Sequence, residues 1–161
     1  MSVAKIVILN WNGAEHLRRF LPSVVAAAPA GVEVVVADNG STDDSLRVLA
    51  TEFPSVGVLR LDANYGFAGG YNRALEQVRA DYYLLLNSDI ETPEGWLAPI
   101  LDVLEREPDV AVVSPKLISW TDRTKFEYAG ASGGFIDFLG YPFCRGRILK
   151  QVEADEGQYD D

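Results

Sequence analysis

Cysteine and histidine are almost absent from this chain. Its 161 residues include one cysteine, Cys144, and one histidine, His16. A lone cysteine cannot form an internal disulfide, which suits a reducing compartment such as the cytosol. With a single histidine and no nucleophile motif around a serine or the cysteine, we expect neither a histidine-based zinc site nor a catalytic triad.

Long hydrophobic runs are also missing. The apolar stretches, of which 6–9 and 83–86 are typical, are too short to cross a bilayer. The N-terminus lacks the basic and then apolar pattern of a signal peptide. We therefore expect a cytoplasmic protein, in which any contact with the inner face of the membrane is peripheral.

Positive charge is scarce. The chain has 14 Lys and Arg against 24 Asp and Glu, which gives a formal net charge of −10. This balance repels a phosphate backbone, so nucleic acid is not an expected partner. Half of the net charge comes from the acids that follow Lys150, namely Glu153, Asp155, Glu156, Asp160 and Asp161.

The chain does contain enough apolar sequence for one globular domain, since 48% of its residues are hydrophobic. From Lys5 to about Val113, short β-branched or leucine runs alternate with longer amphipathic stretches, the pattern of βα units around a parallel sheet. We expect strands at 5–9, 33–37, 56–61, 82–87 and 110–114, and helices at 14–27, 42–52, 67–79 and 95–107. The expected fold class is α/β, with a mostly parallel sheet flanked by helices.

Glycines and aromatic residues are frequent after Ser119. The glycines there include Gly130, Gly133, Gly134, Gly140 and Gly146. This texture predicts loops with one short strand. We expect an α/β core over 1–118, followed by glycine-rich loops and an acidic tail over 119–161. Because compact domains seldom end on such a stretch, we also expect a further packed segment beyond it.

Polar side chains lie where three of the expected strands end. Asn10 and Asn12 follow the first strand, Asp38 and Asn39 the second, and Asn87-Ser88-Asp89 closes the strand at 82–87. In a parallel α/β sheet these strand ends emerge on one rim, which is where such folds bind ligands. The sequence therefore predicts one active site on that rim.

The carboxylates on this rim have alternative interpretations. Asp38 can accept hydrogen bonds from a nucleotide base or ribose, or simply cap the following helix. Asp89 can hold a divalent ion whose other ligands are phosphate oxygens and water, although its tripeptide can also form an ordinary turn. The acidic balance favours the metal, because a bound diphosphate needs a cation to offset repulsion. Asp43 and Asp44 are expected in the first turn of a helix, where they favour its dipole.

A glycine-rich stretch at 62–73 follows the third expected strand. Its glycines permit close backbone approach, and Gly66 begins a helix whose free N–H groups can meet an anion or a polar ring. The spacing is not that of a dinucleotide fingerprint. Asn72 and Arg73 could face a ligand there, or Arg73 could face solvent. Trp11 could form a wall of the same pocket or lie in the core.

Four motifs, in this order, resemble those of family-2, GT-A-type glycosyltransferases, in particular the rhamnosyltransferase-like branch that builds bacterial cell-surface polysaccharides. They are Ile8-Leu9-Asn10-Trp11-Asn12-Gly13, Ala37-Asp38-Asn39-Gly40-Ser41-Thr42-Asp43, Asn64-Tyr65-Gly66-Phe67-Ala68-Gly69-Gly70-Tyr71-Asn72 and Leu85-Leu86-Asn87-Ser88-Asp89. The likeness covers residues 3 to about 118, and its strength lies in the four motifs together.

The resemblance implies a Rossmann-like GT-A nucleotide-diphospho-sugar transferase fold. It also implies transfer of a sugar, with inversion, from a nucleoside diphosphate sugar to a hydroxyl of a saccharide or lipid-linked saccharide acceptor. By analogy Asp38 contacts the base, and Asp89 holds Mg²⁺ or Mn²⁺ in the place of the last acid of a D-x-D motif. Asn87 replaces the first acid, so we expect weak metal binding until the diphosphate supplies ligands. The expected nucleotide-binding residues are Asn10, Asn12, Asp38, Asn39, Gly66, Asn72, Arg73, Asn87 and Ser88.

The general base of the family, a carboxylate in a later glutamate-aspartate motif, has no counterpart in this sequence. Since an acceptor hydroxyl needs a positioned base, we expect a truncated domain that binds the donor with little or no transfer. Two other functions stay open. A sugar-phosphate nucleotidyltransferase would want a basic, glycine-rich loop where this chain has 10–13, and a non-catalytic nucleotide-sugar-binding module would need no base at all.

Overall fold

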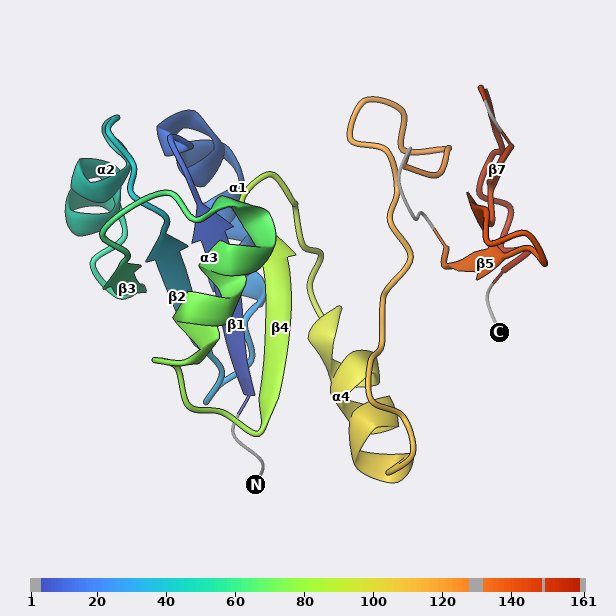
Figure 1. Cartoon of the computed structure of the whole chain (residues 1–161), viewed down its shortest axis with the longest axis horizontal. Coiled ribbons are helices and arrows are strands. Elements are labelled where there is room, and N and C mark those ends of the chain that lie inside the picture. The colour runs from blue at the N-terminus through green and yellow to red at the C-terminus, as the bar shows by residue number, and fades with distance from the viewer. Residues whose placement is uncertain (1–3, 128–131, 149, 160–161) are drawn as a thin grey trace. The chain divides into compact units, whose positions relative to one another are not determined.

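The computed structural model describes residues 4–127, 132–148 and 150–159 (Figure 1). The chain divides into two compact units, Met1–Ala98 and Pro99–Asp161. Gly130 and the last two acids, Asp160 and Asp161, lie outside the described residues. The division near residue 118 into a binding core and an acceptor-side region stays a prediction.

The first unit is built on a four-stranded parallel sheet in the order β3-β2-β1-β4. Its strands are β1 (Ala4–Asn10), β2 (Glu33–Asp38), β3 (Gly57–Arg60) and β4 (Tyr82–Asn87), and its helices are α1 (Ala14–Ala27), α2 (Ser45–Glu52) and α3 (Gly66–Leu75). Asn10 pairs with Asp38 and Leu9 with Asn87, so the carboxyl ends of β1, β2 and β4 lie on one edge. The predicted rim is confirmed.

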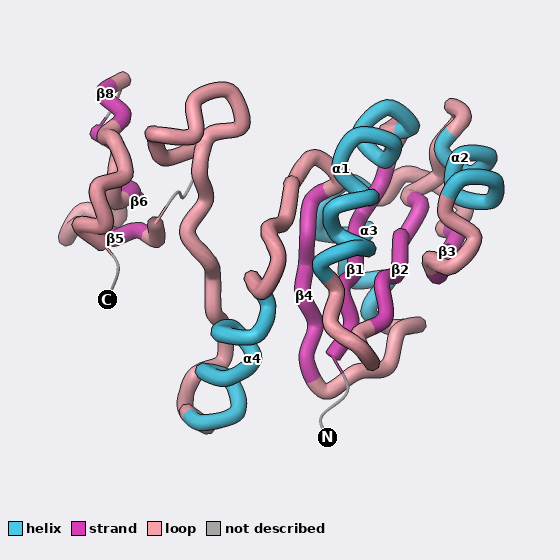
Figure 2. The backbone as a smooth tube through the Cα atoms, turned by 180° about the vertical axis from the view of Figure 1, so that it is seen from behind, coloured by secondary structure: helices cyan, strands magenta, loops and turns pink. Residues whose placement is uncertain are grey.

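The order of the strands reverses between β1 and β4. The chain runs outward from β1 to β3, and α3 then carries it back past β1 to β4. Figure 1 shows α3 on the near face of this sheet, and Figure 2, seen from behind, shows α1 on the opposite face. This is a doubly wound α/β fold, in which ligands bind where the strand order reverses, outside the carboxyl ends of the strands.

Both faces of the central strands are buried, as expected for a parallel sheet between helices. On the α3 face, Val7, Val35 and Ala37 pack against Tyr71 and Ala74. On the other face, α1 presents an apolar stripe of buried side chains, Leu17, Phe20, Leu21 and Val24. Each such side chain contributes about 1.5–3 kcal/mol when it leaves water, so these contacts hold the strand ends in fixed positions.

The remaining elements are α4 (Leu97–Arg106) and a small antiparallel sheet. That sheet contains β5 (Gly134–Ile136), β6 (Pro142–Cys144), β7 (Arg147–Ile148) and β8 (Gln151–Val152), joined in chain order. The buried ring of Phe126 packs closely on Gly146, where a Cβ would lie 2.5 Å from the ring. No helix in the part of the chain that the structure describes has the length and apolar character to cross a membrane.

The structure corrects several expected elements. Residues 110–114 form no strand, because this valine-rich run lies between Pro108 and Pro115 and finds no ladder partner. Helix α2 begins at Ser45 rather than at 42, and α3 ends at Leu75 rather than at 79. The glycine-rich part holds four short strands instead of one, since turns that contain Gly140 and Gly146 let segments of two or three residues pair.

Candidate functional site

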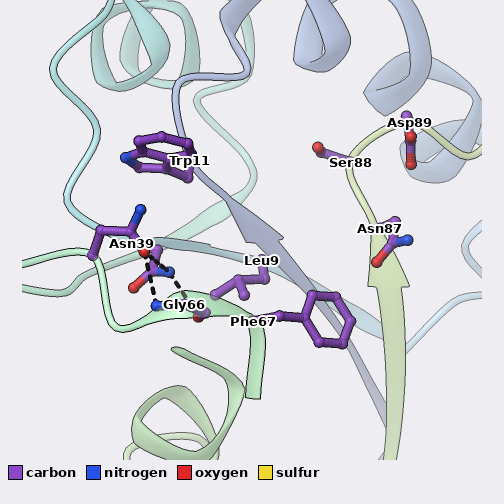
Figure 3. Close-up of a pocket in the computed structure, with 9 residues that line it drawn as sticks. Leu9, Trp11, Asn39, Gly66, Phe67, Asn87, Ser88 and Asp89 are labelled. Carbon is purple, nitrogen blue, oxygen red and sulfur yellow. Dashed lines mark hydrogen bonds between the residues drawn. The ribbon is translucent and has the colours of Figure 1, made fainter. Parts of the chain in front are cut away.

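A pocket of about 450 Å³ opens at the edge of the first unit's sheet, where the strand order reverses. Its lining comes from the ends of β1, β2 and β4 and from the start of α3. The lining residues are Leu9, Trp11, Asn39, Asn64, Gly66, Phe67, Asn87, Ser88 and Asp89 (Figure 3). Five of these, Asn39, Gly66, Asn87, Ser88 and Asp89, were predicted from the sequence, and the structure brings them together.

Two large aromatic side chains of the pocket are open to solvent. Trp11 is 56% exposed and Phe67 is 66% exposed. Figure 3 shows Trp11 on the side of Asn39, whereas Asn87, Ser88 and Asp89 lie together at the end of β4. Exposed aromatic faces on a pocket wall suit a flat, partly apolar group such as a nucleobase. Of the two positions that the sequence allows for Trp11, a pocket wall or the core, the structure therefore has the pocket wall.

Asn39 joins the end of β2 to the start of α3. Its Nδ2 donates to Asn64 Oδ1 at 3.1 Å and to the carbonyl of Gly66 at 3.0 Å, and its Oδ1 accepts from the amide of Tyr65 at 3.0 Å. Both donors of this buried amide and one lone pair of its oxygen are thereby used. Asn39 thus fixes one wall of the pocket. Because the N–H groups of Asn39 are used, Asn64 is the residue of that wall whose amide nitrogen can donate to a ligand.

Asp38 lies beneath the pocket rather than on its lining. The side chain is 2% exposed, and both carboxylate oxygens are hydrogen-bonded. Oδ1 accepts from Asn10 Nδ2 at 3.1 Å, and Oδ2 accepts from the amide of Ser41 at 3.1 Å. Since α2 begins only at Ser45, Asp38 does not cap that helix and instead holds the turn that precedes it.

Asn10 is fully buried under the same edge. Its Nδ2 also lies 3.3 Å from Ser41 Oγ, while its Oδ1 has no hydrogen-bond partner among the residues described. A Cβ on Gly13 would lie 2.4 Å from this Oδ1, so only glycine allows β1 to turn into α1 here. Asn10 therefore does not line the pocket. Its side chain holds the turns after β1 and β2 in place.

The loops after β1 and β2 exchange side-chain caps. Asn12 Oδ1 accepts from the amides of Thr42 at 2.7 Å and Asp43 at 3.2 Å. In return, Asp43 Oδ2 accepts from the amide of Ala14 at 3.0 Å, at the start of α1. The expectation that Asp43 lies in the first turn of α2 is wrong, because α2 begins only at Ser45. Asp43 precedes that helix, and its Oδ1 accepts from the amide of Ser45 at 3.0 Å, so its carboxylate satisfies a free amide at the start of both helices.

The environment of Asp43 changes its acidity. Burial opposes the charged form, but hydrogen bonds from Ser45 and from the amide of Ala14 outweigh this effect and hold the pKa of Asp43 below its usual value. The folded structure therefore favours the ionised form of the Asp43 carboxyl.

We call the reciprocal contacts of Asn12 and Asp43 the loop clasp. Since Trp11 directly precedes Asn12, the clasp also fixes the residue that walls the pocket.

Besides Asn10, Asn12 and Asp38, two further predicted site residues do not line the pocket. Asn72 and Arg73 are exposed on α3. The guanidinium of Arg73 lies 3.8 Å from the centroid of the Tyr65 ring, and the Tyr65 hydroxyl donates to Asp62 at 2.8 Å. The sequence missed Leu9, Asn64 and Phe67, although the last two belong to the glycine-rich stretch and could have been found as its polar and aromatic members.

Asp89 is the one acidic residue of the pocket lining, and it is exposed there. Among the described residues, no three His, Cys, Asp or Glu side chains gather into a metal-binding group. A single carboxylate beside an amide and a hydroxyl fits a Mg²⁺-type ion only where phosphate oxygens and waters complete the coordination. The donor set therefore fits a cation that arrives with a phosphorylated ligand.

The family of the chain follows from comparison with known proteins. The model of Glycosyl transferase family 2 matches residues 5–151, which includes every lining residue of the pocket. The chain belongs to this family. The family resemblance that the four motifs predict is therefore confirmed.

Two relatives carry names that concern polyprenyl-linked chemistry. N-acetylglucosaminyl-diphospho-decaprenol L-rhamnosyltransferase of Mycobacterium tuberculosis is 29% identical over 125 residues, covering 71% of this chain and 41% of that protein. Undecaprenyl-phosphate 4-deoxy-4-formamido-L-arabinose transferase of Sodalis glossinidius is 33% identical over 113 residues, covering 65% of this chain and 34% of that protein. The chain thus spans less than half the length of these relatives.

A solved structure shares the fold. The crystal structure of S. aureus TarS residues 1–349 in complex with UDP-GlcNAc superposes with a TM-score of 0.58 at 21% identity, covering 74% of this chain and 38% of that chain. The chain has the GT-A-type α/β fold that the family resemblance implies.

Proposed function

We propose that the pocket binds a nucleoside diphosphate sugar, and that the protein transfers this sugar to an acceptor hydroxyl in the synthesis of cell-surface polysaccharide. The observation that carries the proposal is the composition of the pocket at the strand reversal. Two exposed aromatic side chains and a single carboxylate line the same pocket, with Trp11 beside Asn39 and Asp89 at the end of β4 (Figure 3), in a chain of glycosyl transferase family 2. A nucleoside diphosphate sugar has a matching base at one end and diphosphate at the other.

The base end of the donor is proposed to lie against Trp11, beside Asn39 and Asn64. Asn64 Oδ1 already accepts from Asn39 and Gly66, which orients its amide nitrogen toward other partners. Asp38, which the family resemblance assigns to the base, is 2% exposed and does not line the pocket. It is therefore proposed to support the base end indirectly, through Asn10 and the turn at Ser41 that it holds.

The diphosphate end is proposed to lie at Asp89, with Asn87 and Ser88 as neutral neighbours. Asp89 would hold a divalent cation there, Mg²⁺ or Mn²⁺, which would supply positive charge to the leaving diphosphate. Asn87 and Ser88 would orient the donor beside it. Because none of the lining residues is basic, the pocket itself offers no side chain to offset the diphosphate charge. This composition also disfavours a nucleotidyltransferase, whose triphosphate carries more charge.

The acceptor is proposed to be a saccharide or a lipid-linked saccharide. Its hydroxyl would attack the face of the sugar opposite the diphosphate, with inversion, and would give its proton to a carboxylate base for which this sequence has no counterpart. The polyprenyl-linked chemistry named for two relatives supports a lipid-linked acceptor. Such an acceptor would be met at a membrane surface, which we propose to be the inner face. Rhamnosyltransferase relatives make dTDP-rhamnose a first donor to test, beside UDP-linked sugars.

Calorimetric titration with UDP, dTDP, GDP and CDP, with and without Mn²⁺, tests donor binding. We expect one nucleotide to bind in a Mn²⁺-dependent way. Asp89→Asn should lose most of the Mn²⁺-dependent gain, about tenfold or more in affinity, and keep the metal-free affinity. Asp109→Asn, an exposed acid after α4, is the charge-matched control and should behave as the native chain. A folded native chain that binds none of the four would overturn the proposal.

A further inference from the structure

An exposed apolar hairpin stands out in the second unit. It comprises β5, β6 and the turn between them, residues 134–144, and we call it the apolar hairpin. Its large exposed side chains are Phe135, Ile136, Phe138, Leu139, Tyr141 and Phe143, and Phe138 at the turn is 95% exposed. Soluble proteins rarely expose so many apolar side chains on one short element without a partner. The pocket described above makes no use of this hairpin.

The turn of the hairpin satisfies most of its own backbone hydrogen bonds. Asp137 Oδ1 accepts from the amides of Leu139 at 2.8 Å and Tyr141 at 2.9 Å. The amide of Asp137 donates to the carbonyl of Tyr141, and the amide of Gly140 donates to the carbonyl of Asp137, each at 3.0 Å. A turn closed in this way leaves few backbone donors to lose water without a replacement. Because the Asp137 carboxylate that closes it is charged, the turn can enter the interfacial layer of a bilayer but not its hydrocarbon core.

The charges around the hairpin differ from those of the chain as a whole. Between residues 132 and 150 there are three basic residues, Arg145, Arg147 and Lys150, against one acid, Asp137. The balance within this stretch is thus +2 in a chain of −10, and the acids Glu153, Asp155 and Glu156 follow shortly after it. The guanidinium of Arg145 lies 5.2 Å from the centroid of the Phe135 ring, at the end of the hairpin away from the turn.

The spacing of apolar turn and basic end fits a membrane surface. Three strand residues at about 3.3 Å each separate the two ends by roughly 10 Å. An interfacial segment buries its apolar face roughly 5–10 Å below the headgroups, so Arg145 would lie at headgroup level when Phe138 is inserted. A protein partner would not require basic residues at this particular distance from an apolar tip.

We propose that the apolar hairpin inserts its turn into the surface of a bilayer that contains anionic lipid. The proposal rests on the proposed function in one respect, since a lipid-linked acceptor would be presented at such a surface. The acidic remainder of the chain opposes adsorption to anionic lipid by charge alone. Binding therefore depends on Phe138, Leu139 and Ile136 entering the interface, and it is shallow and reversible.

Vesicle co-sedimentation of the full chain tests the proposal. The native chain should bind vesicles of phosphatidylcholine with phosphatidylglycerol more strongly than vesicles of phosphatidylcholine alone. Phe138→Ser and Leu139→Ser should each lower the partition coefficient roughly tenfold, because each loses most of one buried apolar side chain. Val112→Ser removes another exposed apolar side chain of the same unit, 83% exposed, and should leave binding unchanged.

A direct contact measurement completes the test. Phe138→Trp should add a fluorescence signal that brominated lipid quenches, whereas a chain with Val112→Trp should add none that is quenched. Absence of vesicle binding by the folded native chain overturns the proposal, as does equal binding by the serine variants. Concentration-dependent self-association that Phe138→Ser abolishes, without vesicle binding, assigns the hairpin to a second copy instead. Nucleotide titration is independent of all these readouts, so the two proposals fail separately.

Discussion

Asn12 shows that a polar side chain after a strand can serve to hold two loops together. It is the one residue other than glycine with a positive φ among those described, at 49°, a conformation that asparagine tolerates better than most residues. That backbone turns its Oδ1 toward the free amides of Thr42 and Asp43. A polar residue next to a pocket can thus be essential to it without touching a ligand.

The pKa of Asp43 predicts a pH-dependent stability. The folded state binds a proton on this carboxyl less readily than the unfolded chain does, so folding is favoured above the ordinary aspartate pKa and this contribution is lost as pH falls below about 4. Asp43→Asn should lower the free energy of unfolding by about 1–2 kcal/mol at neutral pH, since the amide can accept at only one end. Urea denaturation at neutral and acid pH measures both values.

The diagnostic result for Asp43 is the difference between the variant and the native chain. That difference should shrink toward zero as the pH falls below about 4, because the native carboxyl is then protonated too. Asp109→Asn serves as the control and should give a small difference at every pH. A constant difference for Asp43→Asn across the pH range would show that the loop clasp does not depend on the charge of Asp43.

At the scale of elements, α3 approaches the strands more closely than an ordinary helix could. A Cβ on Gly70 would lie 2.9 Å from Leu9 Cδ1 and 2.9 Å from Asn39 Nδ2, both of which belong to pocket-lining residues. The glycine therefore sets the distance between the helix and the carboxyl ends of β1 and β2. The width of the pocket therefore depends on this close packing between α3 and the strand ends.

Gly70→Ala should destabilise the protein although alanine favours helix. Overpacking costs about 1–3 kcal/mol, against a gain of about 1 kcal/mol in helix propensity. Gly69→Ala is the comparison, because its Cβ would meet only Tyr65 Cβ at 3.3 Å. Thermal unfolding should rank Gly70→Ala below Gly69→Ala, and nucleotide titration should show the weaker binding for Gly70→Ala. The reverse ranking would place the close approach elsewhere.

The sequence predicts the helices and strands correctly where the hydrophobic periodicity extends over many residues. The prediction fails where strand formation depends on whether a segment finds a pairing partner. Helix α1 was predicted with its observed bounds, and all four strands of the parallel sheet were predicted to within a residue or two. Residues 110–114 have strand composition but no partner to supply the ladder. The strands of the apolar hairpin are too short for periodicity to show, and only the pairing of segments brought together by turns creates them.

For the site, the sequence predicts the place better than the partners. Polar residues at the ends of parallel strands must share one edge, so Asn39 and Asp89 could be assigned to one pocket. Which polar atoms are already occupied depends on side chains that meet only in three dimensions, as Asn12 meets Asp43 and Arg73 meets Tyr65. Spacing in the sequence carries no information on such pairs.

At the scale of the whole molecule, the charge of the chain sets the conditions for anion binding. The net charge is −10, and the pocket lining contains one acid and no base. A diphosphate therefore approaches a surface of its own sign, and a bound cation reverses that sign locally. The same acidity limits adsorption of the apolar hairpin to anionic lipid, so both proposed contacts depend on a local feature that outweighs the overall charge.

Ionic strength should consequently act in opposite directions on the two modes of nucleotide binding. Without a divalent cation, affinity for the preferred nucleotide should rise as salt increases from about 0.01 M to about 0.15 M, because the screening length falls from about 30 Å to about 8 Å and weakens long-range repulsion. With Mn²⁺ present, the same change should lower the affinity, because the attraction between cation and diphosphate is screened. Calorimetry at the two salt concentrations measures both slopes. Metal-free affinity that falls with salt would mean that a basic side chain reaches the diphosphate, against the composition of the lining.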